Sequence, residues 1–224
     1  MRKGRLSALR AVCLILCLHL GLWVFIGFLQ GASTRSVSST LRNETLDALV
    51  ILLVVVFCKK IYLITFEEMG MKYPRPGSKV WLCLLIGGLL WVVVDSVSDA
   101  IDQLVPASLS VPMEYDFSAI YAHSRGFSRV GLFFVLGFVT PAVEEIFFRG
   151  LIYAALKRGF SPIGSLILSS GIFGLWHVYP SLIVAAVLIG CGLTWLREYE
   201  SSLLGPIMAH TTINCLSLIF VGTR

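Results

Sequence analysis

The sequence contains few charged residues, and this scarcity excludes an ordinary soluble domain. Only 14% of its 224 residues are Asp, Glu, Lys or Arg, whereas soluble domains contain roughly 25%. With 57% hydrophobic residues and a mean hydropathy of +0.86, the chain has too few polar side chains to cover one aqueous globule. We therefore expect an integral membrane protein.

Paired cysteines, low-complexity tracts and internal repeats are also missing. The six cysteines show no disulfide spacing and lie in or beside apolar runs, where they read as small buried hydrophobic residues. No HExxH motif of the common zinc proteases occurs. The lack of an inverted repeat gives no support to a transporter fold.

Long apolar runs are abundant, and they predict the fold class: an all-α, polytopic membrane helix bundle with about seven transmembrane helices. A span needs about 20 predominantly apolar residues. The fourth run is long enough to cross at a tilt, and we expect a bend at its Pro141. The predicted spans are residues 11–29, 46–66, 80–105, 128–157, 161–178, 181–196 and 203–221.

The basic residues predict the orientation. The N-terminal apolar run of 11–29 exceeds the roughly 7–15 residues of a signal-peptide core, so we expect a retained helix. With a cytoplasmic N-terminus, most Lys and Arg residues flank the spans on the inside, as the positive-inside rule requires. The net charge of +5 then indicates membrane lipid as a partner and no nucleic acid. Short loops suggest a bacterial plasma membrane, and the acidic outer segment 95–127 is expected to be a solvated loop or interfacial helix.

Glu144-Glu145-x-x-x-Arg149 places ionisable groups inside an apolar run. Such groups cost roughly 2.5–3.5 kcal/mol each on insertion scales and usually mark function. Glu145 and Arg149 are four residues apart, so a helix stacks them as an ion pair. Glu144 is rotated by about 100° and lacks a charged partner along its own helix. It is a candidate general base; the alternative is a structural ion pair with a spare protonated glutamate.

Two further polar motifs follow in later spans. His177 closes Phe173-Gly-Leu-Trp-His177, where it can equally be an interfacial residue. His210 and Asn214, spaced i and i+4, share one helix face. They can donate hydrogen bonds to one point or join two helices. His19 in the first span has no such companion and is expected to be structural.

Taken together, these side chains predict a site that activates water. A glutamate can take the proton of a water molecule, and an imidazole can orient that water. His210 and Asn214 can stabilise the oxyanion of an attacked carbonyl. The rival interpretation is a non-catalytic membrane protein for binding, immunity or transport that uses the same polar cluster.

The three motifs, EEIFFR at 144–149, FGLWH at 173–177 and HTTIN at 210–214, resemble the CPBP intramembrane proteases in this order. That family includes CAAX prenyl endopeptidases and bacteriocin-processing, lysostaphin-resistance-like and Abi proteins. The resemblance covers roughly residues 127–221. We therefore divide the chain into 1–126, with three spans and the outer loop that are not diagnostic, and 127–224, the expected catalytic core.

The resemblance implies a role for each residue. Glu144 would activate water, His177 would help to hold it, and His210 and Asn214 would form the oxyanion site. Glu145 and Arg149 would shape the site or contact substrate. No cofactor is expected; a zinc ion bound by Glu144, His177 and His210 is the alternative. The implied activity is an intramembrane endopeptidase acting on a CAAX-type substrate, prenylated at its C-terminus, or on another membrane-anchored protein or peptide.

Overall fold

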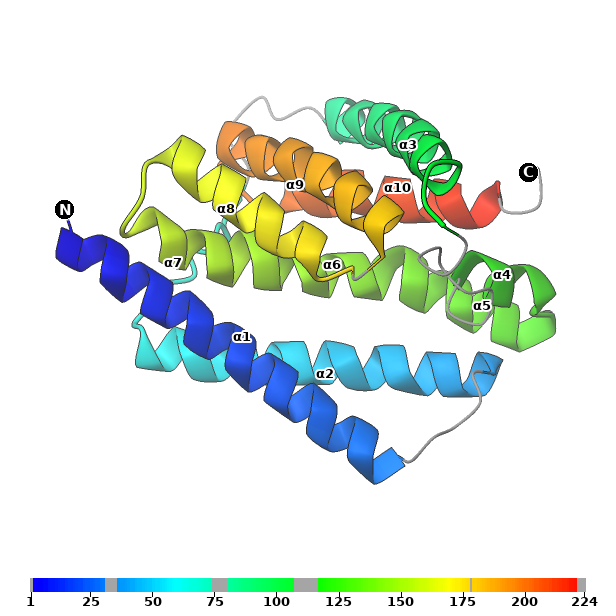
Figure 1. Cartoon of the computed structure of the whole chain (residues 1–224), viewed down its shortest axis with the longest axis horizontal. Coiled ribbons are helices and arrows are strands. Elements are labelled where there is room, and N and C mark those ends of the chain that lie inside the picture. The colour runs from blue at the N-terminus through cyan, green and yellow to red at the C-terminus, as the bar shows by residue number, and fades with distance from the viewer. Residues whose placement is uncertain (1, 31–35, 74–79, 107–116, 178, 221–224) are drawn as a thin grey trace.

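A computed structural model describes residues 2–30, 36–73, 80–106, 117–177 and 179–220, and over these residues all regular structure is helical (Figure 1). The all-α membrane bundle predicted from hydropathy is confirmed. The α-helices are α1 (Arg2–Gln30), α2 (Val37–Ile61), α3 (Val80–Asp102), α4 (Phe117–His123), α5 (Gly126–Phe134), α6 (Thr140–Glu145), α7 (Tyr153–Lys157), α8 (Pro162–Leu175), α9 (Pro180–Glu200) and α10 (Leu204–Ile219). Two π-helical segments join α5, α6 and α7: η3 (Val135–Val139) and η4 (Ile146–Ile152).

Within the described residues, three helices are long and apolar enough to cross a membrane: Val80–Asp102, Gly126–Lys157 and Pro180–Glu200. Shorter apolar helices are Leu6–Leu22, Pro162–Leu175 and Leu204–Ile219. The count of seven spans therefore stays a prediction. α2 is in neither group, because it has charged residues of both signs near its start and two lysines near its end.

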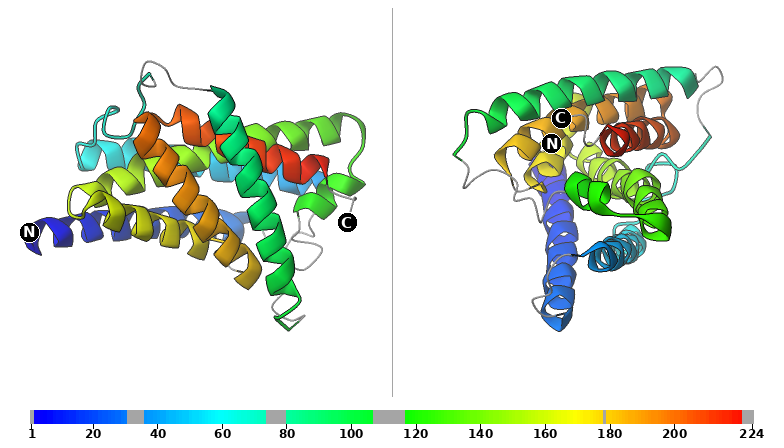
Figure 2. Two further views of the ribbon diagram at one scale, coloured as in Figure 1. Left: turned by 90° about the horizontal axis from the view of Figure 1, so that it is seen from above. Right: turned by 90° about the vertical axis from the view of Figure 1, so that its right-hand side faces the viewer.

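The long helix from Gly126 to Lys157 lies in the middle of the bundle. α1 and α2 pack on one side of it, where α1 contacts α7 and α2 contacts α6 (Figures 1 and 2). α9 and α10 lie on the other side, and α3 covers them as the outermost helix (Figure 2). α8 packs between α7 and α9. The central helix is therefore in contact with helices from the N-terminal part of the chain, α1 and α2, and from the C-terminal part, α8 and α10.

The fourth predicted span is confirmed as one continuous helix, Gly126–Lys157. It passes through Pro141 rather than ending there. The departure from α-geometry comes just before the proline, in η3, where the Thr140 N–H donates to the Val135 carbonyl five residues back. The second π-segment follows Glu145, and its last turn closes from the Tyr153 N–H to the Phe148 carbonyl. The two adjacent glutamates therefore lie in a short α-helical piece between two π-segments, which are often found at functional sites.

The predicted start of the fifth span is confirmed, and the predicted start of the second span is not. Ser161 caps α8 by accepting from the Gly164 N–H at 3.2 Å, with Pro162 in the first turn. The second span was predicted to begin at residue 46, but α2 begins at Val37, because Ser36 forms a capping box with Ser39.

The outer segment 95–127 was predicted to be a loop or an interfacial helix, and its first residues overlap the third predicted span, 80–105, which the structure shows as α3. α3 continues through Asp95 and Asp99 to Asp102, since no proline or glycine interrupts it there. α4 fills part of the remainder. The predicted ends of the fifth and seventh spans, Val178 and Val221, lie outside the described residues, as do Glu114 and Asp116 of the outer segment.

α3 and α10 approach each other closely at Gly87. A Cβ atom at this position would lie 2.5 Å from the Ala209 carbonyl oxygen and 2.8 Å from the Thr212 Cβ. Real Cβ atoms do not come so near to a backbone, so only glycine fits. Ala209 directly precedes His210, and the contact at Gly87 therefore helps to fix the height of that histidine on α10.

We expect Gly87→Ala to lower the midpoint of thermal unfolding by roughly 2–10 °C, because overpacking costs about 1–3 kcal/mol. Gly88→Ala is the matched control, since a Cβ at Gly88 meets nothing within 4 Å. That change should leave the midpoint equal or slightly higher, as alanine favours a helix. The measurement is thermal unfolding of the detergent-solubilised protein. Equal midpoints for the two variants would contradict the close approach.

Candidate active site

The predicted ion pair on the central helix is present and completely buried. Arg149 Nη1 lies 2.9 Å from Glu145 Oε1, and both side chains have no solvent exposure. The guanidinium also lies 4.2 Å from the centre of the Phe173 ring, a cation–π contact across to α8. The ion pair therefore links α6 to η4 within the central helix, and the cation–π contact of Arg149 links this helix to α8.

His210 of α10 lies between the two glutamates. Its Nδ1 is 2.8 Å from Glu145 Oε1, the same oxygen that Arg149 contacts. A carboxylate oxygen that accepts from a guanidinium has no hydrogen to give, so Nδ1 of the imidazole is the donor. The other ring nitrogen, Nε2, is 3.7 Å from Glu144 Oε2, which is too far for a direct hydrogen bond.

The two adjacent glutamates have different surroundings. The Glu145 side chain is fully buried and its Oε1 accepts from two donors. The Glu144 side chain keeps 18% of its surface exposed and faces Nε2 of His210 across the 3.7 Å gap. Glu144 is therefore the carboxylate of the two that a further molecule can reach.

His177 stands at the end of α8 and is held by its own helix. Its Nδ1 lies 2.9 Å from the Phe173 carbonyl oxygen. Because a carbonyl only accepts, Nδ1 carries the hydrogen, and the neutral ring keeps its lone pair on Nε2. The Phe173 ring meets the His177 ring at 4.9 Å and the His210 ring at 5.9 Å, edge-on in both cases. One aromatic ring therefore contacts both imidazoles.

Asn214 lies one turn beyond His210 and contacts a different part of the central helix. Its Nδ2 donates to the Leu136 carbonyl in η3 at 2.9 Å. The structure thus brings Glu144, Glu145, Arg149 and His210 into direct proximity and adds His177 through Phe173. The catalytic roles expected for these residues stay predictions.

Acidic residues of α2 extend the site, and the sequence analysis did not single them out. Glu44 Oε2 accepts from Thr140 Oγ1 at 3.2 Å, one turn before Glu144. Glu44 and Asp47 both lie near enough to Glu144 for their charges to act on it. The available signal was their i, i+3 spacing within LRNETLD. Glu44 was missed because the apolar run placed the start of this span at residue 46, and Asp47 then stood at its polar edge without a partner.

His19 of α1 is buried against the outer wall of the site. Its ring centre lies 4.7 Å from that of Trp176 and 5.3 Å from that of Phe147. Its Nε2 is 3.4 Å from Asp47 Oδ1 on α2. These contacts agree with the structural role expected for His19 and link α1 and α2 to the helices that carry Glu144 and His177.

The donor set provides no ready-made zinc site. In the part of the chain that the structure describes, no three His, Cys, Asp or Glu side chains are grouped as metal ligands. His210 Nε2 lies 3.7 Å from Glu144 Oε2, but His177 is not grouped with these two side chains. The three candidates are therefore not gathered around one zinc position. The cofactor requirement stays a prediction.

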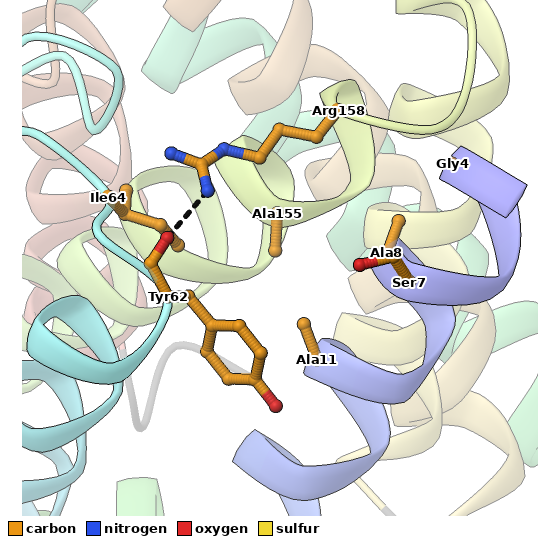
Figure 3. A pocket seen from close by; sticks show the side chains of 8 residues that line it. All are labelled: Gly4, Ser7, Ala8, Ala11, Tyr62, Ile64, Ala155 and Arg158. Carbon is orange, nitrogen blue, oxygen red and sulfur yellow. Dashed lines mark hydrogen bonds between the residues drawn. The ribbon is translucent and has the colours of Figure 1, made fainter.

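A cavity of about 130 Å³ lies elsewhere, between α1, α7 and the segment after α2 (Figure 3). At its edge Arg158 donates to the Tyr62 carbonyl at 2.6 Å and pairs with both carboxylate oxygens of Glu68. Burial raises the pKa of the Glu68 carboxyl, but bonds from the Thr65 N–H and Arg158 outweigh this and hold it below its ordinary value. None of the predicted site residues lines this cavity. Its walls are Gly4, Ser7, Ala8, Ala11, Tyr62, Ile64, Ala155 and Arg158.

We expect Arg149→Met to destabilise the protein by about 3–5 kcal/mol, because it leaves a buried carboxylate without its partner. The double variant Glu145→Gln with Arg149→Met should lose less than the sum of the single losses, since it removes both charges. Arg158→Met, which breaks a half-exposed ion pair with Glu68, is the control and should cost no more than about 1 kcal/mol. Denaturant unfolding in detergent compares the native protein, the two single variants, the double variant and the Arg158→Met control. Equal losses for the two arginine variants would refute the importance of burial.

One family model matches the chain, over residues 126–216: type II CAAX prenyl endopeptidase Rce1-like. No curated protein and no solved structure matches it. The matched segment begins with α5 and ends within α10, and it contains all six residues predicted for the site. The resemblance found in the three motifs is thereby confirmed over residues 126–216.

Proposed function

From the match of residues 126–216 to the Rce1-like family of type II CAAX prenyl endopeptidases, we propose that the chain hydrolyses a peptide bond with water activated by Glu144. The observation that carries the proposal is the position of His210 between the two glutamates. One carboxylate is occupied by the imidazole and the guanidinium. The other faces the second imidazole nitrogen at a distance that a bridging water molecule can span.

Glu144 is the better base because its carboxylate is reachable and Glu145 is not. In the proposed reaction Glu144 takes a proton from water, and the resulting hydroxide attacks the carbonyl carbon of the peptide bond. Glu144 then returns the proton to the leaving nitrogen as the C–N bond breaks. The lone pair on Nε2 of His177 would accept the second hydrogen of the water and so orient it.

His210 would stabilise the oxyanion. Since Nδ1–H is used on Glu145, donation to the substrate requires a hydrogen on Nε2 as well. The oxyanion role therefore belongs to the doubly protonated imidazolium, which can pair with the Glu145 carboxylate. Arg149 neutralises the same carboxylate from the other side and keeps its oxygen in place. Glu145 and Arg149 thus act on the reaction by holding His210.

The proposed substrate is a protein or peptide that is itself anchored in the membrane. The reactive carboxylate lies on a helix long and apolar enough to span it, so a lipid-attached chain can reach Glu144 laterally. A prenylated C-terminal CAAX sequence meets this requirement, and so does another membrane-anchored precursor. An N-terminus in the cytoplasm and a bacterial plasma membrane remain part of the proposal.

The first test compares the termini of membrane proteins in cells that express the native chain or Glu144→Gln at matched levels. General base catalysis contributes about 10²–10⁴-fold, so new termini should be seen only with the native chain. Glu67→Gln is the control, because this exposed carboxylate pairs with Lys72 outside the site. It should give the same termini as the native chain.

The result also identifies the substrate, since each new terminus names a cleaved protein. The same peptide, synthesised with and without its prenyl group, then shows whether the lipid is required. Identical termini with the native chain and Glu144→Gln, both folded, would favour a binding or immunity protein on a protease scaffold.

Chelation tests the cofactor prediction separately. The water mechanism needs only side chains of this chain, so exhaustive treatment with a chelator should leave cleavage of the identified peptide unchanged. The assay uses purified protein, with a known zinc protease treated in parallel to show that the chelation was complete. Loss of activity that zinc restores would replace the glutamate mechanism by a metal-dependent one.

A further inference from the structure

The Leu136 carbonyl in the central helix has no donor available from the next turn. In an α-helix its partner would be the N–H of Thr140, and in a π-helix that of residue 141. The Thr140 N–H is directed to the Val135 carbonyl instead. Residue 141 is a proline and has no N–H. The combination of a π-turn with Pro141 therefore leaves this backbone oxygen without a bond inside its own helix.

Asn214 supplies the missing hydrogen bond from α10. Its Nδ2 lies 2.9 Å from the Leu136 oxygen. A carbonyl oxygen can only accept, so the amide nitrogen rather than the amide oxygen must face it. One of the two hydrogens on this nitrogen is thus used to hold the backbone of η3, and it is not available to a substrate.

Neighbouring contacts hold the same turn from both sides. On the α10 side, Cys215 Sγ lies 3.9 Å from the Gly137 carbonyl oxygen, and a Cβ at Gly137 would come within 3.0 Å of that sulfur. On the α2 side, Thr140 Oγ1 donates to Glu44. Two helices therefore fix the junction between η3 and α6.

The junction determines where Glu144 points. An α-helix turns by about 100° per residue, so a change of one residue in the register of η3 would rotate the whole of α6 by a similar angle. Glu144 lies one turn beyond the junction, and its distance from His210 depends on that rotation.

We propose that Asn214 is a positioning residue, whose bond to the Leu136 carbonyl holds η3 in π-geometry and so aims Glu144 at His210. This role rests on the proposed function of Glu144. It differs from the oxyanion role that the family resemblance implies, and the two make different predictions when Pro141 is replaced.

Pro141→Ala provides the test, because it restores an N–H that can donate to Leu136. Asn214→Leu should lower the midpoint of thermal unfolding by roughly 3–8 °C in the native chain, where it leaves a buried carbonyl unpaired. In the Pro141→Ala background the same change should lower it far less. Thr212→Val is the control on the same helix, since Thr212 bonds only within α10 to Met208. Its effect should be the same in both backgrounds.

Cleavage of the peptide identified above gives the second readout. Asn214→Leu should reduce kcat/KM by about tenfold or more in the native chain, which corresponds to a loss of about 1.4 kcal/mol of transition-state stabilisation. In the Pro141→Ala background the same change should reduce kcat/KM far less, because the new N–H holds η3 in place of Asn214. An oxyanion donor would instead give the same loss of kcat/KM in both backgrounds and no change in the unfolding midpoint. That pair of results would overturn the proposal.

The unfolding measurements need no catalysis, so they decide the question even if Pro141→Ala abolishes activity. They also separate this proposal from the proposed function. Full activity of Glu144→Gln would refute the glutamate mechanism and leave the coupling between Pro141 and Asn214 intact. Equal unfolding losses in the two backgrounds would refute the positioning role and leave the mechanism standing.

Discussion

A single carboxylate oxygen joins the two parts of this site. Glu145 Oε1 accepts from Arg149 on its own helix and from His210 on α10. All three side chains are buried, and breaking a buried ion pair is costly, so the three side chains fix the distance between the central helix and α10. Glu144 depends on this arrangement because its relation to His210 follows from it. The more accessible Glu144 is thus positioned by its less accessible neighbour, Glu145.

The central helix combines rigidity with irregular backbone. Two π-segments flank the short α6, and the first of them leaves the Leu136 carbonyl without a bond inside its own helix. In a membrane such groups must find partners within the protein. α10 provides Asn214 for this purpose, and α2 provides Glu44 as acceptor for the side-chain hydroxyl of Thr140. The helices around α6 therefore contribute to the site through backbone support as well as through reactive side chains.

Local spacing predicted much of the site, and tertiary contacts account for what it missed. The Glu145–Arg149 pair follows from an i, i+4 rule that operates within one helix. The placement of His210 Nδ1 on Glu145 instead depends on how two helices pack, which no spacing within either one reveals. The same holds for Asn214, whose partner is a backbone oxygen 78 residues away. Glu44 was overlooked because hydropathy locates apolar runs, and α2 begins in a polar one. Residues 1–126 thus reach the site although their sequence is not diagnostic.

The Phe173 ring, which touches both His177 and His210, has a consequence for how the site can change. The ring packs edge-on against each imidazole, so its size contributes to the separation of the two histidines. A larger or smaller side chain at this position would alter the reach of both histidines while every ionisable group stayed in place. The volume of the apolar Phe173 side chain therefore influences where the imidazoles of His177 and His210 lie.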